Sequence, residues 1–519
     1  MANFSTKIFG LAGAAVVFAG MAFGQATCTT PTSNANFVPV EATTAQVASL
    51  TFTCNGATAG GILNVQVFLS PSLPITSKVI DTSTGKTEAT LSNGTNAVQG
   101  TATGSSINFT GLVLVAGTQT ITISNVRINA SSIAVGTGVP PAITETAFVS
   151  GAGAVPVALA PTTVAFAQSG ISAKAFSKTF NSTTGALSST ASGANNFVIC
   201  NAQSFSLSTV IQINENFASA FKAASEASTT PVMAGTGNAI NTNDRLQIVF
   251  TNVPANATIY VPVSAIPSQN SATAKIQATS SGTGTFTALT ASTSSSAPTV
   301  YGGGVAALTA TGGTATAYFD VVTEDNNAID QFNVPVYVSY SANAVAGSNT
   351  AITASVSYAP VGSTQIPNFV IGSSTTALAG TTFQQCTTSL LFPFVTNQLG
   401  FDTGIAISNT STDPFGTQGA VAQAGTCTMN FYGAGAPSAA VTTPNVPSGT
   451  TYAVVLSSVA AGFQGYVITQ CNFQYAHAFA FITDGVGANG GLSQGYLASV
   501  IPDTNQAKRA AGVGEVLGN

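Results

Sequence analysis

An alternation of apolar and polar residues with a period of two runs through most of this chain. In one segment the apolar positions are Leu63, Val65, Val67 and Leu69. The same pattern recurs in residues 50–54, 121–123, 246–250 and 332–340. Because successive side chains of a strand point to opposite faces, each segment predicts a strand with one buried face. Short strands separated by Gly, Pro and Asn predict an all-β, multi-domain chain of immunoglobulin-like, antiparallel β-sandwich modules.

Two segments suggest other local structure. Asn214 is a good helix N-cap residue, and Phe217, Phe221 and Ala224 follow at helical spacing. We therefore expect one short amphipathic helix near 214–227 that covers the end of a sheet. Residues 251–256 are rich in turn formers and predict a hairpin between the strands on either side.

Composition shifts predict the domain boundaries. A first β-sandwich is expected over residues 26–161, ending in an Ala- and Pro-rich stretch. A β-rich middle domain follows over 164–385, with two sandwiches as the alternative because residues 279–299 are rich in Ser and Thr. A C-terminal β-sandwich is expected over 386–503, followed by a flexible tail at 504–519.

The first 24 residues have the features of a secretory signal. Lys7 precedes an apolar stretch that ends in the small-residue pattern Ala22-Phe23-Gly24. The alternative, a retained membrane anchor, is disfavoured because about 20 uninterrupted apolar residues are needed to cross a bilayer. We expect cleavage after Gly24 and a secreted, extracellular or cell-surface protein without a membrane span.

The cysteines are even in number, and export would bring them into an oxidising compartment, where disulfides are the default. They are Cys28, Cys54, Cys200, Cys386, Cys427 and Cys471. Spacing does not fix the pairing. We favour Cys28 with Cys54 and Cys427 with Cys471, which leaves Cys200 with Cys386. The first two pairs would each contribute on the order of 3 to 4 kcal/mol in the chain-entropy model.

Ionisable side chains are scarce. Only 5% of the 519 residues are charged, with 11 Lys and Arg, 16 Asp and Glu and one His. An average protein has roughly 25%. Such scarcity argues against an enzyme, and the absence of basic clusters argues against a nucleic-acid partner. The high hydrophobic content, 45%, nevertheless predicts a folded chain.

Residues 491–495 match the G-x-S-x-G pattern of a hydrolase nucleophile elbow around Ser493. The chain's one histidine, His477, precedes Ser493, whereas hydrolases of that fold place the histidine last, and no helical pattern follows the serine. We interpret the match as chance. A hydrolase built on His477, Asp484 and Ser493 is kept as an alternative.

Two glycine-rich segments match nucleotide-binding patterns but lack the flanking residues or structure that such sites need. Residues 485–490 match G-x-G-x-x-G, but a strand-like segment follows where a dinucleotide site needs a helix. Gly85-Lys86-Thr87 resembles the end of a P-loop, but Ile80 stands at the first glycine position. Both are interpreted as turns, and no cofactor is expected.

By alternation, His477 shares a strand face with Cys471, Phe473, Tyr475, Phe479 and Phe481. Since a disulfide cysteine usually points inward, that side of the strand is expected to face the core. We therefore interpret His477 as a structural imidazole among aromatic rings, with a ligand-contacting or acid–base role as the alternative.

The densest carboxylate group is formed by Asp320, Glu324, Asp325 and Asp330. Hard oxygen ligands on a loop can hold calcium, although the spacing is not that of an EF-hand. A solvated acidic loop is the favoured interpretation and calcium the weaker one. Nearby Tyr318, Tyr337 and Tyr340 could offer a stacking platform for a sugar.

Three segments carry a resemblance. Residues 389–411, 427–432 and 465–477, the last ending in Phe473-Gln-Tyr-Ala-His477, resemble the C-terminal module of secreted multi-module bacterial β-rich proteins. Residues 214–221 and 243–261 are similar to the middle part of such proteins. The resemblance covers about a third of the chain closely. It implies export and a multi-module β architecture, and it assigns no functional residue.

These expectations converge on a non-enzymatic secreted or cell-surface protein with a structural or adhesive role. Nearly uncharged surfaces repel one another weakly, so the partner would be a second copy of the chain or another neutral surface. The alternative is an extracellular module that binds a glycan or another polymer through loops at the end of a sandwich. Exposed aromatic side chains in a shallow groove would favour that alternative.

Overall fold

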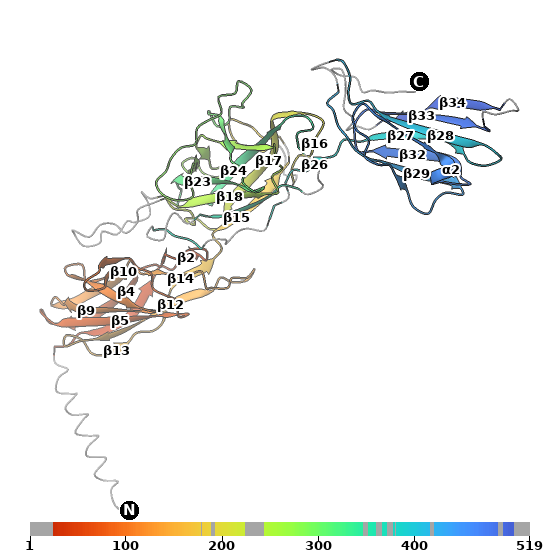
Figure 1. The fold of residues 1–519 in the computed structure, drawn as a ribbon. Coiled ribbons are helices and arrows are strands. Elements are labelled where there is room, and N and C mark those ends of the chain that lie inside the picture. Colours follow the sequence, from red (N-terminus) through yellow and green to blue (C-terminus); the bar gives the residue numbers. More distant parts are fainter. Residues whose placement is uncertain are drawn as a thin grey trace, which may run out of the picture.

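The structure is a computed structural model that describes residues 24–177, 179–187, 193–223, 243–345, 351–359, 366–370, 377–378, 380–415, 420–485 and 491–502. The expected signal (1–24, apart from Gly24) and the tail (504–519) lie outside these residues. The described chain is almost entirely β, as predicted, and its sheets form three successive units (Figure 1). The described residues contain no helix with the length and hydrophobicity needed to span a membrane.

The N-terminal unit contains strands β1 to β14. They are β1 (Thr27–Ser33), β2 (Asn36–Pro39), β3 (Ala45–Gln46), β4 (Leu50–Ala57), β5 (Ile62–Ser70), β6 (Val79–Asp81), β7 (Lys86–Ser92), β8 (Ala97–Thr103), β9 (Ser106–Val113), β10 (Gly117–Ser124), β11 (Arg127–Ile128), β12 (Ala142–Ser150), β13 (Val157–Ala158) and β14 (Thr162–Gln168). Twelve of them form one sheet in the order β1-β4-β10-β7-β8-β9-β5-β12-β14-β2, with β13 on β12 and β6 on β7. Because β14 pairs with β12, this sheet continues to Gln168, beyond the expected end at residue 161.

The middle unit consists of strands β15 to β26. They are β15 (Ile171–Phe176), β16 (Phe197–Val198), β17 (Gln203–Glu215), β18 (Arg245–Thr251), β19 (Thr258–Pro262), β20 (Ile266–Pro267), β21 (Lys275–Thr279), β22 (Val305–Leu308), β23 (Ala315–Thr323), β24 (Gln331–Tyr340), β25 (Thr353–Tyr358) and β26 (Phe383–Gln384). One five-stranded sheet has the order β15-β17-β24-β19-β22, and the other has the order β20-β21-β23-β18-β25. The predicted hairpin at 251–256 is wrong, because β18 and β19 belong to different sheets and the turn carries the chain from one sheet to the other.

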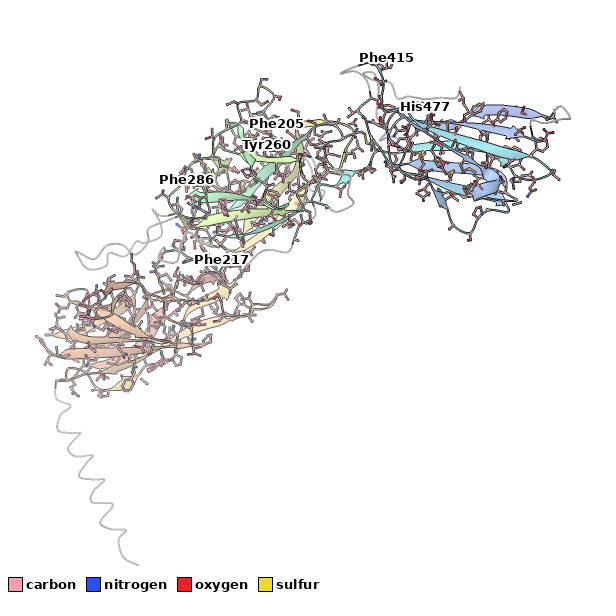
Figure 2. All side chains as sticks on the ribbon, in the orientation of Figure 1. Phe205, Phe217, Tyr260, Phe286, Phe415 and His477 are labelled. Atoms are coloured by element: carbon pink, nitrogen blue, oxygen red, sulfur yellow. A yellow bond between two sulfur atoms is a disulfide. The ribbon has the colours of Figure 1, made fainter. Side chains whose placement is uncertain are left out.

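The helix predicted near 214–227 is also wrong over its described part. Asn214 and Glu215 end β17, where Asn214 pairs with both β15 and β24 and Glu215 pairs with β15. Residues 216–223 contain bends and a short turn and no helix. The apolar stripe is buried all the same, with Phe217 against Phe37 of the N-terminal unit (Figure 2). Sheet pairing therefore overrides the local helical pattern. Residues 224–227 lie outside the described part.

The C-terminal unit consists of strands β27 to β35 and one short helix. They are β27 (Thr388–Thr396), β28 (Asp402–Asn409), β29 (Cys427–Ala434), β30 (Val441–Thr442), β31 (Thr451–Val455), α2 (Leu456–Val459), β32 (Gln464–Cys471), β33 (Ala476–Thr483), β34 (Ser493–Leu497) and β35 (Ser499–Ile501). A five-stranded sheet, β30-β29-β32-β27-β35, and a four-stranded sheet, β31-β28-β33-β34, enclose a core of their own.

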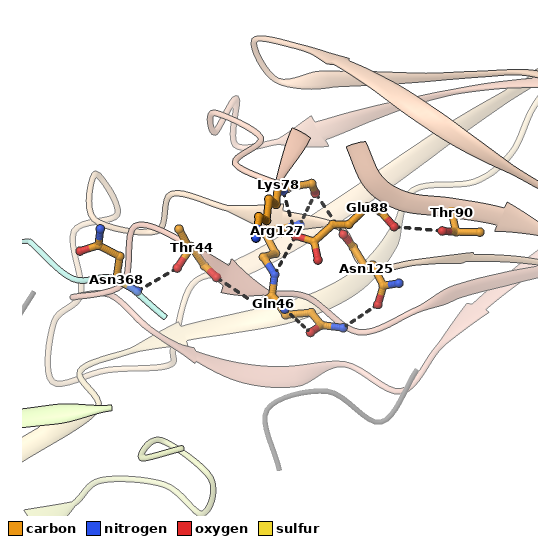
Figure 3. Close-up of polar contacts among 9 residues, drawn as sticks. Thr44, Gln46, Lys78, Glu88, Thr90, Asn125, Arg127 and Asn368 are labelled. Carbon is orange, nitrogen blue, oxygen red and sulfur yellow. Dashed lines mark hydrogen bonds and ion pairs between the residues drawn. The ribbon is translucent and has the colours of Figure 1, made fainter. Parts of the chain in front are cut away.

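The N-terminal and middle units share one continuous core, and polar contacts join them. The carboxylate of Glu41 accepts hydrogen bonds from Ser169 Oγ at 2.6 Å and the backbone N–H of Gly170 at 3.0 Å. Phe369 of the middle unit forms an isolated antiparallel bridge with Ala42 of the N-terminal unit. The backbone N–H of Asn368 donates to Thr44 Oγ1 of the N-terminal unit at 3.0 Å (Figure 3). These contacts hold the two units against each other.

A buried ion pair lies beside this junction. Arg127 Nε and Glu88 Oε1 are 3.0 Å apart, and both side chains are almost fully buried. The same guanidinium donates to Gln46 Oε1 at 3.1 Å and to the carbonyl of Thr44 at 3.4 Å (Figure 3). Glu88 also accepts the backbone N–H of Lys78 at 2.8 Å. Burial lowers the pKa of Arg127, and the carboxylate of Glu88 opposes that effect.

Three disulfides stabilise the fold, in the pairing favoured from sequence: Cys28–Cys54, Cys200–Cys386 and Cys427–Cys471. The first and third join directly paired positions on neighbouring strands. The second joins Cys200, between β16 and β17, to Cys386, between β26 and β27, and these two residues are 186 positions apart. No cysteine is left free.

Candidate functional site: the apolar surface of the C-terminal unit

Exposed apolar side chains are concentrated in the C-terminal unit. Of the 21 large hydrophobic side chains that are exposed in the described residues, 11 belong to this unit, which is less than a quarter of the chain. Between residues 386 and 502 the sequence has three carboxylates, Asp402, Asp413 and Asp484, and no lysine or arginine. A neutral, apolar surface of this kind is typical of an interaction site.

The most regular part of this surface is the outward side of the sheet β31-β28-β33-β34, which we call the apolar face. In β28 the buried positions are Ile405 and Ile407, so Gly404 and Ala406 point outward. In β33 the inward positions hold alanines, and the outward ones hold Phe479 and Phe481. These two phenylalanines are 40% and 37% exposed. The usual arrangement of large residues inside and small ones outside is thus inverted in β33.

Strand register places these residues in two rows across the sheet. In the first row, Val455, Gly404, Phe481 and Gly495 are successive cross-strand partners. In the second row, the partners are Ala453, Ala406, Phe479 and Leu497. The two phenylalanines form a ridge on β33. Gly404, Ala406 and Ala453 form a trough beside it.

The ridge is held in place by its neighbours. Phe479 and Phe481 stack with ring centroids 6.4 Å apart and ring planes 22° apart. The ring of Phe479 lies over Gly495, where an added Cβ would come within 2.2 Å of the ring. Between the ridge and Val455 the trough forms an open cavity of about 550 Å³, to which Ser458 of α2 also contributes. None of the residues that line it is charged.

The structure corrects the expected orientation of His477. The sequence pattern predicts the core side of its strand, but Ala476, Ala478 and Ala480 occupy that side and His477 points to the half-buried outer side. The period-two pattern is interrupted at residues 472–475, which are not part of a strand and lead from β32 in one sheet to β33 in the other. Tyr475, in this connection, has a left-handed conformation with φ of 59°. The orientation of Cys471 therefore does not carry over to β33. His477 lies in the part of the unit nearest the middle unit (Figure 2).

The three residues of the hydrolase alternative are not brought together. Ser493 pairs with Thr483 at one end of β33, and His477 is six residues away along the same strand, roughly 20 Å at the usual rise per residue. Asp484 is exposed beside Ser493, far from the imidazole. Ser493 begins a strand and not a helix, so it is not on a nucleophile elbow. The glycine-rich match at 485–490 lies largely outside the described residues.

A second apolar cavity lies at the end of the unit that is remote from the middle unit. It measures about 480 Å³ and is lined by Phe394, Leu399, Phe401, Ile482 and Leu492 together with polar residues of neighbouring strands. Leu399 is 93% exposed. The side chains of Gln464, Gln494 and Ser493 line the same cavity and make no hydrogen bond with the described part of the chain.

An aromatic pair marks the opposite sheet. Tyr432 of β29 and Tyr466 of β32 are cross-strand partners, and both are more than 40% exposed. Their rings stack with centroids 5.0 Å apart and planes 13° apart. By contrast, two of the tyrosines expected to stack on a sugar are buried, because Tyr337 and Tyr340 pack into the middle unit at 7% and 5% exposure. Tyr318 is half-buried. The exposed aromatic pair thus belongs to a different unit from the one that the sequence suggests.

The acidic group of residues 320–330 is not the solvated loop that is favoured from sequence. Asp320, Glu324 and Asp330 are buried, and Asp325 is half-buried. Asp320 forms an ion pair with Arg245, whose Nη2 lies 3.1 Å from Asp320 Oδ2. Asp325 Oδ2 accepts a hydrogen bond from Ser271 Oγ at 2.9 Å. Among the described residues, no group of three or more His, Cys, Asp or Glu side chains is placed to hold a metal ion.

Buried carboxyl groups elsewhere have raised pKa values. Burial raises the pKa of Glu215 to about 7 and that of Asp244 to about 8. Glu145, on the core side of β12, is 1% exposed, and burial raises its pKa to about 8. A raised pKa in a cleft can mark an acid or base, but these groups are enclosed by protein and open to no cavity described above. Their raised pKa values make the stability of the folded chain depend on pH.

Comparisons with known proteins find only remote likenesses. No protein-family model matches the sequence, and no curated protein matches it. A solved major pilin subunit of Bacillus cereus is 8% identical and superposes with a TM-score of 0.24 over 92% of this chain and 97% of the pilin. The full-length major pilin SpaD of Corynebacterium diphtheriae is 9% identical, with a TM-score of 0.22 over 82% of this chain and 80% of its own.

A serine-rich repeat adhesion glycoprotein of Streptococcus agalactiae is 11% identical, with a TM-score of 0.16 over 69% of this chain and 97% of its own. All three of these proteins are pilins or adhesins. TM-scores this low carry no argument about function.

The functional surface is only partly foreseeable. Sequence reasoning anticipates neutral contacts, but it places Phe479 and Phe481 in the core. Both neighbouring strands alternate large and small residues, but they bury opposite kinds. In β28 the large residues Ile405 and Ile407 face the core, whereas in β33 the alanines face the core and the phenylalanines face outward. When small residues occupy every second position of a strand, the large residues between them can be the exposed ones.

Proposed function

We propose that this chain is a non-enzymatic secreted or cell-surface protein that acts as a structural or adhesive element through neutral surface contacts. The observation that carries the proposal is the apolar face of the C-terminal unit, where a phenylalanine ridge lies beside an open trough with no charged lining residue. Burying such a surface is favourable by roughly 25 cal/mol per Å² of apolar area. Because no ion pair is involved, salt should not weaken the contact.

Three disulfides support the proposed location, since they persist in oxidising compartments such as the cell exterior. The first two units share a core and are joined by polar contacts. This supports a structural role, because the two units can then carry the C-terminal unit as one body.

The proposal is tested by adsorption of the mature protein to three surfaces on a quartz-crystal microbalance: an uncharged apolar surface, an anionic surface and a cationic surface. We expect retention on the apolar surface that persists at about 1 M NaCl, where charge interactions are screened. Retention confined to a charged surface and released by salt would contradict the proposal.

A second candidate is binding of a neutral glycan or another polymer at the remote end of the C-terminal unit. The cavity there combines Phe394 and Phe401 with the side chains of Gln464, Gln494 and Ser493. Apolar walls with a few polar groups are typical of ligand sites. A glycan array tests this candidate: a retained neutral glycan that is lost on Gln494→Ala supports it, and an array without any retained ligand dismisses it.

A further inference from the structure

We infer that the apolar face is a self-complementary interface through which two copies of this chain pair about a two-fold axis that runs along the strands between β28 and β33. The inference rests on the proposed function, and it names a second copy of the chain as the partner of the apolar face. It follows from the order of large and small residues across the four strands.

The second row of the apolar face has small residues on one side and large ones on the other, whereas in the first row large and small residues alternate. The second row reads Ala453, Ala406, Phe479, Leu497 from β31 to β34. Rotation by 180° about an axis along the strands reverses this order in the second copy. Phe479 then lies opposite Ala406 of the other copy, and Leu497 lies opposite its Ala453.

At the centre of the first row, a large residue also lies opposite a small one. Phe481 of β33 lies opposite Gly404 of the other copy, because the axis runs between these two strands. An axis perpendicular to the strands would instead place ridge on ridge. Among two-fold arrangements of two facing sheets, only the axis along the strands lets each ridge enter the other copy's trough, so the register selects one geometry.

Charge does not oppose this pairing. None of the residues that line the trough is charged, and the unit contains no lysine or arginine. Asp402, at the edge of the face, already accepts hydrogen bonds from the backbone N–H and the hydroxyl of Ser457. A neutral face with alternating ridge and trough suits a second copy of itself better than a charged partner.

The size of the face predicts the strength of the contact. Four strands at about 4.8 Å spacing and about six residues of length give roughly 400 Å² per copy. Specific interfaces bury about 800 Å² per partner, so this one falls at the low end, with weak and transient pairs. We therefore expect a dimer at about 0.1 mM protein or above and a monomer on dilution.

The experiment uses the mature full-length chain and a complementary pair of variants, Phe481→Lys and Gly404→Glu. An added Cβ at Gly404 meets nothing closer than 3.9 Å, so the second substitution fits the fold. We expect each variant alone to remain monomeric in sedimentation velocity. An equimolar mixture should dimerise, because the introduced ammonium group of one copy then faces the introduced carboxylate of the other while the second ridge and trough stay native.

The control is Tyr466→Lys, which changes an equally exposed aromatic residue on the opposite sheet and should dimerise like the wild type. Circular dichroism checks that all variants fold. If either variant fails to fold, the double variant Ala453→Cys, Leu497→Cys replaces it. Its two thiols lie about 14 Å apart within one copy, whereas the thiol at position 497 of one copy would face the thiol at position 453 of the other across about 10 Å, the usual spacing of facing sheets. That spacing is too long for a disulfide, so a short bis-maleimide that spans about 10 Å is used, and we expect it to link the two copies.

The outcomes separate this inference from the proposed function. A wild-type chain that dimerises while Phe481→Lys dimerises equally well would overturn the apolar face as the interface and leave self-association intact. Homogeneous monomer at about 0.5 mM, with retention on the apolar surface, would overturn the dimer and keep the adhesive role. A mixture that stays monomeric although the wild type dimerises would overturn the proposed axis.

Discussion

Single buried residues decide how the N-terminal unit responds to substitution. Arg127 and Glu88 form an ion pair that is sealed from solvent beside the contact with the middle unit. Removing one partner of such a pair leaves an uncompensated buried charge, whereas removing both leaves none. The two kinds of change therefore have different consequences.

We expect Arg127→Met to lower the free energy of unfolding by about 3 to 5 kcal/mol. The double variant Arg127→Met, Glu88→Leu should lose clearly less than the single variant. Denaturant unfolding monitored by circular dichroism measures both. A single variant as stable as the wild type would show that the pair is not sealed in solution.

Glu145 gives a pH dependence of known sign. Burial raises its pKa from an ordinary value near 4.5 to about 8, so the folded state holds the proton more tightly than the unfolded state. Its contribution to stability is complete below about pH 4.5 and is lost as the pH rises toward 8. Glu145→Gln should therefore flatten the fall in stability between about pH 5 and about pH 8.

Thermal unfolding of the wild type and Glu145→Gln at several pH values tests this expectation. Asp244, whose pKa burial also raises to about 8, should preserve part of the dependence in the variant. Identical pH profiles for the two proteins would show that Glu145 is not buried as described.

Strands and their connections differ in how far sequence determines them. Period-two alternation locates β5 and β18 correctly, because each has one buried face. It also locates β24, although that strand is buried on both faces from Phe332 to Val338. Turn residues after Phe250 mark a turn but cannot show that it leads into a different sheet. The apolar stripe from Phe217 to Phe221 is buried as expected, but its backbone is set by long-range pairing of β17, which local spacing does not contain.

The apolar face shows the same limit. Alternation predicts the strand around Phe479. It does not show which side of that strand faces the core, because residues 472–475 interrupt the pattern and carry the chain from one sheet to the other. Residues far apart in sequence, such as Ala406 and Phe479, become neighbours through register alone.

The Cys427–Cys471 bridge should contribute strongly to the C-terminal unit. It joins paired positions of β29 and β32, which are 44 residues apart in the chain. Replacing both cysteines with alanine should lower the free energy of unfolding of this unit by about 2 to 5 kcal/mol. Limited proteolysis and calorimetry measure the effect. Unchanged calorimetric transitions would contradict the expected contribution.

Calcium should have little effect on the segment between β23 and β24. Asp320 is held by Arg245, and Asp325 by Ser271, so the acidic side chains do not converge on one point. We expect the same thermal unfolding midpoint in about 5 mM Ca²⁺ and in EDTA. A rise of several degrees with calcium would revive the calcium hypothesis for Glu324 and Asp330.

At the scale of the whole molecule, charge and apolar exposure are distributed unequally. The buried ion pairs Arg127–Glu88 and Arg245–Asp320 lie in the first two units, whereas the C-terminal unit presents the apolar face without a single lysine or arginine. Neutral contact by that unit is the claim from which the proposed function and the two-fold pairing both follow.

Sedimentation velocity of the mature protein at about 0.5 mM, in about 0.05 M and about 1 M NaCl, tests that claim most directly. We predict association that is equal or stronger at the higher salt concentration, because apolar burial is not screened. Association that disappears in high salt would show that charges drive the contact and would contradict the account.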